Sequence, residues 1–111
     1  MKMRALMTVA GVCALATASA ITPAVAKVDG DTIILGSSIS LTGKYATNGL
    51  YTQRGYDFAV KTINDAGGVK VDGKSYKLAV TYYDDESTPA RGAQLAEPLI
   101  QQDGVQYMLG P

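Results

Sequence analysis

Three apolar runs of strand length alternate with two helical repeats in this sequence, and this alternation limits the possible fold more than any other feature. The runs cover residues 32–37, 76–83 and 105–109. The first run is continuous, which suits a parallel strand covered on both faces. Strands that alternate with helices in a β-α-β-α-β order predict an α/β fold with a parallel sheet and right-handed crossovers. If the first strand lies between the other two, one helix covers each face of the sheet.

The first helix is expected to begin near residue 48 or 49. It should end at Gly67 and Gly68, which supply a left-handed C-terminal cap. Its buried stripe consists of the residues that recur at helical spacing, namely Thr52, Gly55, Tyr56, Ala59, Val60, Ile63 and Ala66. Beyond the helix, Asp72 and Gly73 predict a tight turn within a short polar excursion that precedes the second strand.

The second helix has clear signals at both ends. Thr88 is the expected N-cap, and Pro89 occupies the first helical position, where its missing N–H is not needed. Gly104 marks the end of the helix. Pro98 falls inside the helix and removes one backbone hydrogen bond, so a bend or an early end is expected there. The expected buried stripe is Ala93, Ala96, Leu99 and Ile100.

Residues 1–26 have the features of a signal peptide. Lys2 and Arg4 form a short positive segment, residues 5–18 are apolar, and small residues lead up to a cleavage point after Ala26. A cut after Ala20 is the less favoured alternative. A membrane anchor is also disfavoured, because the apolar run is shorter than the ~20 residues that span a bilayer. We therefore expect an exported, periplasmic protein whose mature part starts at residue 27.

The composition of residues 27–111 excludes several classes of function. Without Lys2 and Arg4, 8 of the 10 basic groups remain against 10 acidic groups. A net charge near −2 does not indicate the basic surface that binds nucleic acid. The chain has no histidine, and its single cysteine, Cys13, lies in the expected signal peptide. Within residues 27–111, Cys/His zinc sites and histidine-assisted nucleophilic catalysis are therefore excluded. No cofactor, metal ion or catalytic residue is expected.

The polar loop at residues 36–49 is the candidate binding site. It follows the first strand and leads into the first helix, at the edge of an open sheet where ligands bind and where the helix N–H groups favour anions. Ser40, Thr42, Tyr45 and Asn48 are the side chains expected to contact a ligand. The alternative for each residue is ordinary loop or cap chemistry, with Asn48 as the N-cap of the helix.

Two other patterns in the sequence could indicate sites of chemistry. A phosphate-binding P-loop needs four residues between its glycines and Ser or Thr after its lysine. Here six residues separate Gly36 from Gly43, and a tyrosine follows Lys44, so this motif is rejected. The acidic residues 84–86 are interpreted as a solvated turn rather than as a metal site or a paired-carboxylate acid and base, because neighbours in sequence need not converge on one point.

Several stretches together resemble type I periplasmic solute-binding proteins, most closely the leucine/isoleucine/valine-binding family of ABC importers. They are Ile34-Leu35-Gly36, Ser40-Leu41-Thr42-Gly43, Asn48-Gly49, Gly55, Ala59-Val60, Ile63-Asn64-Asp65-Ala66-Gly67-Gly68, Tyr83-Asp84-Asp85-Glu86-Ser87-Thr88-Pro89 and Met108-Leu109-Gly110-Pro111. The resemblance implies two α/β lobes that close over an amino acid or similar small acid and then dock on a membrane permease. Residues 27–111 would be the first part of the N-terminal lobe.

The resemblance also bears on the ligand. Asn48 aligns with a ligand-facing position that is often aromatic in branched-chain binders. An asparagine there is as compatible with a polar amino acid, an amide or an aromatic acid as with leucine. The leading hypothesis is a non-catalytic solute-binding subunit of an ABC importer. The alternatives are a ligand-sensing extracytoplasmic receptor domain on the same fold and, less favoured, an exported α/β enzyme.

Overall fold

Residues 27–110 are described by the structure, a computed structural model, and the expected signal peptide lies outside them. The elements in chain order are β1 (Val28–Asp29), β2 (Thr32–Ile39), α1 (Ala46–Asp65), β3 (Val69–Val71), β4 (Lys74–Asp84), α2 (Pro89–Gln101) and β5 (Met108–Leu109). In the described part of the chain, no helix is long and apolar enough to cross a membrane.

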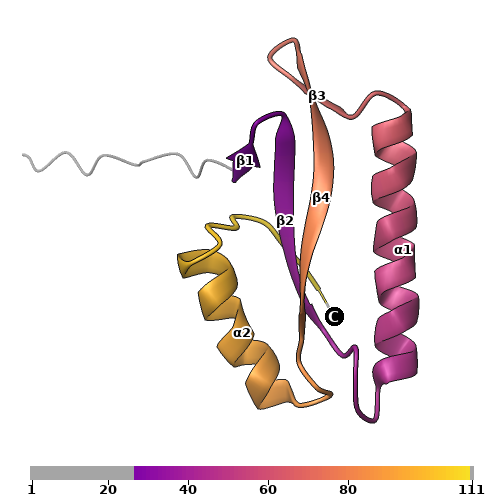
Figure 1. The fold of residues 1–111 in the computed structure, drawn as a ribbon, viewed down its shortest axis with the longest axis vertical. Helices are drawn as coiled ribbons and strands as arrows, with labels where there is room; N and C mark the ends of the chain where they lie inside the picture. The colour runs from indigo at the N-terminus through magenta and orange to yellow at the C-terminus, as the bar shows by residue number, and fades with distance from the viewer. Residues whose placement is uncertain (1–26, 111) are drawn as a thin grey trace, which may run out of the picture.

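The centre of the sheet is β2, which is the arrangement that places one helix on each face. It pairs in parallel with β4 along its whole length and with β5 at Gly36 and Ser37. Short antiparallel strands complete the sheet, with β1 beside β2 and β3 beside β4. Figure 1 shows the sheet between α1 and α2, so each crossover places its helix on a different face. The predicted α/β fold with a parallel β-α-β-α-β core is thus observed.

Alternate residues of β2 point to opposite faces of the sheet. Gly36 faces α2, because an added Cβ would lie 3.3 Å from Leu99 Cδ2 of that helix and 2.8 Å from Val105 Cγ1 just after it. Ile39 faces α1 and is only 1% exposed. Leu99 and Val105 are the other fully buried apolar side chains in the described residues, and they lie on the α2 face against Gly36.

Several boundaries of α1 and β4 differ from the expected ones. The helix begins at Ala46, before the expected residues 48–49, because its start is stabilised by a distant segment described below. The predicted left-handed cap is confirmed by φ angles of +105° at Gly67 and +82° at Gly68. The turn at Asp72 and Gly73 is also confirmed, and the hairpin it closes lets β4 start at Lys74, two residues earlier than expected. In the expected stripe of α1, Thr52, Tyr56 and Val60 are half-buried, but Gly55, Ala59, Ile63 and Ala66 are exposed.

The second helix starts as predicted, with Thr88 in the N-cap position and Pro89 at its first turn. The early end at Pro98 is wrong, because α2 continues to Gln101. Pro98 lies in the last turn, where its carbonyl accepts the N–H groups that close the helix. The third strand is shorter than expected. Val105 is buried before the strand starts, and its N–H bonds to the carbonyl of Leu99 at 2.9 Å.

Candidate ligand-binding site

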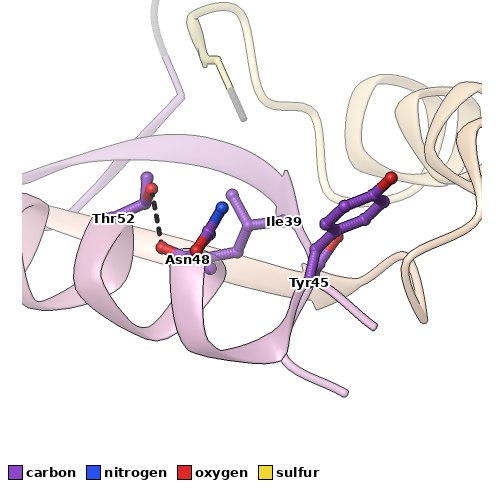
Figure 2. Close-up of a pocket in the computed structure, with 6 residues that line it drawn as sticks. Ile39, Tyr45, Asn48 and Thr52 are labelled. Atoms are coloured by element: carbon purple, nitrogen blue, oxygen red, sulfur yellow. Dashed lines mark hydrogen bonds between the residues drawn. The ribbon is translucent and has the colours of Figure 1, made fainter. Parts of the chain in front are cut away.

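A hollow of about 230 Å³ lies where β2 ends and α1 begins (Figure 2). It is lined by Ile39, Ser40, Tyr45, Asn48, Gly49 and Thr52. The structure therefore brings together three of the four predicted ligand-contacting residues, namely Ser40, Tyr45 and Asn48. The fourth, Thr42, is in the same loop but is not among the residues that line the hollow.

The hollow depends on a close approach between α1 and the end of β2 at Gly49. A Cβ added to Gly49 would lie 1.7 Å from the backbone oxygen of Ser40, so only glycine fits. Gly49 is buried although its neighbours on the helix are exposed. Because the helix backbone rests on the loop backbone here, the first turn of α1 forms one side of the hollow.

Asn48 and Tyr45 provide the accessible polar and aromatic groups of the hollow. Figure 2 shows the Asn48 amide and the Tyr45 ring projecting to the same side of the helix start. Both residues are exposed, and within residues 27–110 no hydrogen bond engages the Asn48 side chain. Asn48 is the third residue of α1, so the alternative role as N-cap is wrong. That position belongs to Tyr45, whose side chain makes no cap hydrogen bond.

The hydroxyls of Ser40 and Thr42 are bonded to carboxylates. Ser40 Oγ donates to Asp85 Oδ1 at 2.6 Å, and Thr42 Oγ1 donates to Asp84 Oδ2 at 2.7 Å. The prediction of a solvated acidic turn is therefore wrong for both aspartates, and Asp85 is only 8% exposed. Among the residues with described positions, no cluster of three or more potential ligands could hold a metal ion.

Asp84 is surrounded by hydrogen-bond donors, and this environment changes its acidity. Its Oδ1 accepts backbone N–H bonds from Leu41, Thr42 and Glu86 at 2.8–3.1 Å. The Thr42 hydroxyl, followed by these backbone donors, lowers the pKa of Asp84 to about 2, although desolvation opposes the shift. The sequence signal for this contact is indirect. The carboxyl ends of neighbouring parallel strands meet at one edge of the sheet. Residues at the end of β2 and at the end of β4 are therefore expected to lie close together.

A second hollow, of about 340 Å³, lies on the other face of the sheet beside α2, and no sequence pattern predicted it. Ser38 and Asp85 supply its polar groups, and Met108 and Leu109 line its far side. The Ser38 hydroxyl is buried without a hydrogen-bond partner in the described residues. The remaining lining residues are Pro89, Gly92, Ala93 and Ala96 of α2, so this hollow offers few groups that would orient a polar solute.

Comparison with known proteins identifies the family. The model of a family described as periplasmic binding protein matches residues 32–111. The chain belongs to this family. The predicted membership and the predicted fold, that of a type I periplasmic binding protein lobe, are both confirmed. Membership implies an extracytoplasmic location, and the family consists of solute-binding proteins rather than enzymes.

Individual relatives support the same assignment. The Leu/Ile/Val-binding protein homolog 1 of Brucella abortus (strain 2308) is 36% identical over 78 residues, which are 70% of this chain and 20% of the relative. Homolog 3 of Brucella melitensis is 32% identical over the same length. One similar solved structure is that of the branched-chain amino acid transporter substrate binding protein LivJ from Streptococcus pneumoniae, in complex with isoleucine. Its sequence is 35% identical and the TM-score is 0.63. The match covers 72% of this chain and 22% of the LivJ chain. The chain thus spans about a fifth of the length of these relatives.

Proposed function

We propose that this chain forms one wall of the ligand site of a solute-binding protein that serves an ABC importer. The solute is an amino acid or a similar small carboxylate or amide, which the protein delivers to membrane permease subunits. The observation that carries this proposal is the hollow at the carboxyl edge of the sheet, with the unengaged Asn48 amide beside the Tyr45 ring.

The size and chemistry of the hollow fit one side of a small-molecule site. Its volume of about 230 Å³ is below the ~300–1,000 Å³ of complete ligand pockets, so further groups must close it. The Asn48 amide can both donate and accept hydrogen bonds, and Tyr45 offers an aromatic face and a hydroxyl. The N-terminus of α1 would favour a carboxylate by ~0.3–1 kcal/mol. The relatives named for leucine, isoleucine and valine make amino acids the first solutes to test.

The four predicted contact residues take different parts in this proposal. Tyr45 and Asn48 contact the solute through their side chains. Ser40 lines the hollow. Its hydroxyl donates a hydrogen bond to Asp85, and the hydroxyl oxygen can still accept a second hydrogen bond from a solute. Contact with Thr42 remains a prediction, because Thr42 does not line the hollow and its hydroxyl is bonded to Asp84.

A thermal-shift screen tests the proposal, with the twenty L-amino acids, their amides and small carboxylates as probes. Its sample is the full-length mature protein, which here means residues 27–111 within a protein of the relatives' length. We expect at least one of them to raise the melting temperature. Asn48→Ala should then weaken its binding by about 2–10-fold, the equivalent of one lost hydrogen bond. Gln94→Ala, an exposed amide on α2, is the matched control and should bind normally. If no probe stabilises the protein, the proposal fails.

Export is the second part of the proposal. The positive and apolar segments of residues 1–26 support a signal peptide that is cleaved after Ala26. N-terminal sequencing of the protein recovered from the periplasm should give Lys27 as the first residue. A start at Ile21 would indicate the alternative cut after Ala20, and an intact leader in the membrane fraction would contradict cleavage.

A further inference from the structure

The acidic turn, residues 84–87, is bonded to the β2–α1 loop, residues 40–45, more extensively than a chance contact between two loops would explain. Six hydrogen bonds join the two segments. They use side chains of the acidic turn and both backbone and side-chain groups of the loop. Neither Asp84 nor Ser87 lines the hollow, so any effect on a solute must pass through the loop.

Asp84 fixes the first half of the loop. Its carboxylate accepts the N–H groups of Leu41 and Thr42 at 2.9 and 3.1 Å, and the hydroxyl of Thr42 at 2.7 Å. One carboxylate thus determines the direction of two consecutive peptide groups as the chain leaves β2. These bonds have a charged acceptor, which makes them stronger than bonds between neutral groups.

Ser87 fixes the second half of the loop. Its Oγ donates to the carbonyl of Thr42 at 2.7 Å and accepts the N–H of Tyr45 at 2.9 Å, so one hydroxyl bridges both sides of Gly43. In a capping box, the N–H of the N-cap residue is bonded by a side chain three positions later in the helix. Here the N-cap residue is Tyr45, and its N–H donates to the hydroxyl of Ser87, which is 42 residues away in the sequence. The start of α1 is therefore capped by another segment of the fold.

The backbone of the acidic turn adopts an unfavourable conformation to make these contacts. Glu86 and Ser87 have φ angles of 54° and 61°, in the left-handed region that L-residues avoid. Across the contact, Gly43 has φ of +81°, and a Cβ there would lie 2.9 Å from the Glu86 carbonyl oxygen. Two consecutive non-glycine residues in this region must be held by their surroundings, and such strain is concentrated at functional sites.

We propose that Asp84 and Ser87 are positioning residues for the ligand site, because they order the loop that carries Tyr45 and the helix start that carries Asn48 before the solute arrives. This inference rests on the proposed function. A loop that is ordered in advance loses little freedom when a solute binds, whereas a loosened loop must be ordered at the expense of affinity. The low pKa of Asp84 is consistent with this role, since the carboxylate stays ionised at any pH where the protein would meet its solute.

The test compares Asp84→Asn and Ser87→Ala in the full-length mature protein. Asp72→Asn is the control for lost charge, because it lies in the β3–β4 turn at a φ of 48° that asparagine also tolerates. Ser75→Ala, an exposed residue of β4, is the control for a lost hydroxyl. One measurement is amide hydrogen exchange of residues 40–46 without solute. The other is the dissociation constant for whichever of the twenty L-amino acids stabilises the wild type most.

We expect both variants to exchange residues 40–46 at least tenfold faster than the wild type and to bind about tenfold more weakly. Exchange in β2 and β4 should be unchanged, and saturating amino acid should restore protection of residues 40–46. The controls should behave as the wild type. If Asp84→Asn does not fold, Ser87→Ala alone decides, because it removes only one hydroxyl.

Three outcomes would overturn the inference. The first is unchanged exchange in residues 40–46. The second is faster exchange there with a dissociation constant within twofold of the wild type. The third is loss of protection throughout β2 and β4, which would indicate a purely structural role. If none of the amino acids binds to the wild type, the proposed function fails instead. The exchange data would then still decide whether the acidic turn orders the loop.

Discussion

At the scale of single residues, Gly49 is the position where the site tolerates least change. The methyl group of Gly49→Ala would overlap the Ser40 carbonyl, and relieving the overlap would move α1 away from β2. We expect a loss of about 1–3 kcal/mol in the free energy of unfolding, the usual range for overpacking. Urea denaturation of the full-length protein measures this loss.

The matched control is Gly55→Ala on the same helix. Nothing lies within 4 Å of a Cβ at Gly55, and the residue is exposed. Alanine should therefore stabilise the helix by about 0.5–1 kcal/mol through its higher propensity. Equal effects of the two substitutions would mean that the close contact at Gly49 does not govern stability.

The second prediction at this scale concerns acid. Asp84 has a pKa of about 2 in the folded protein against an ordinary value of 3.8. Between these values the unfolded chain binds more protons, so the stability from this group is fully present above about pH 4 and is lost as the pH falls toward 2. The free energy of unfolding should fall less steeply over this interval in Asp84→Asn than in the wild type. Parallel curves would exclude a depressed pKa at Asp84.

At the scale of elements, Asn64 joins the end of α1 to the free edge of β4. Its Nδ2 donates to the Leu78 carbonyl at 2.9 Å, and its Oδ1 accepts the Leu78 N–H at 2.8 Å. Asn64→Ala leaves both backbone groups without these partners in a part-buried place and should cost about 1–3 kcal/mol. Asn64→Asp keeps only the acceptor, so its melting temperature should lie between those of the wild type and the alanine variant. An alanine variant as stable as the wild type would show that water replaces the amide fully.

The elements also show how far sequence reasoning reaches. The apolar runs, helical repeats and glycines predicted the parallel sheet and the cap at Gly67 and Gly68, whereas they left the central position of the first strand open. The end of β2 was missed, because Ile39 lies among hydroxyl residues that are typical of a loop, and only its pairing with β4 makes it core. The start of α1 was missed because the group that closes it, Ser87, is remote in sequence.

For the candidate site, too, the sequence predicted some features and missed others. The loop and three of the residues that line the hollow were predicted, because strand ends in open parallel sheets are general binding positions. The bonds of Ser40 and Thr42 to Asp85 and Asp84 were not, since the pairing of strand ends places the two segments near each other but does not specify which side chains bond. Hydroxyl residues in such a loop can either contact a solute or anchor the loop, and only the fold separates these roles.

At the scale of the whole molecule, residues 27–110 contain little buried apolar surface. Ile39, Leu99 and Val105 are the fully buried apolar side chains among them, while Tyr51 and Phe58 on α1 are 65% and 73% exposed. Four members of the expected stripe of α1 are exposed as well. Parallel sheets are normally covered on both faces, and the 78 matched residues are only 20% of the length of the Brucella abortus relative. Much of the apolar surface seen here is therefore expected to be covered in a protein of the relatives' length.

This expectation gives a prediction for residues 27–111 produced alone. A segment of this size normally needs a well-filled core to fold independently, and the entropy of ordering each residue, about 1–2 kcal/mol, must be offset by burial. We expect broad thermal unfolding by circular dichroism, binding of a dye that reports exposed apolar surface, and a urea m-value below that of a two-state domain of equal length. The control is a protein of the relatives' length that contains these residues, and it should unfold sharply and bind little dye. A sharp transition of the isolated segment would mean that its few buried side chains and its backbone pairing are sufficient, and that the lobe is assembled from independently stable parts.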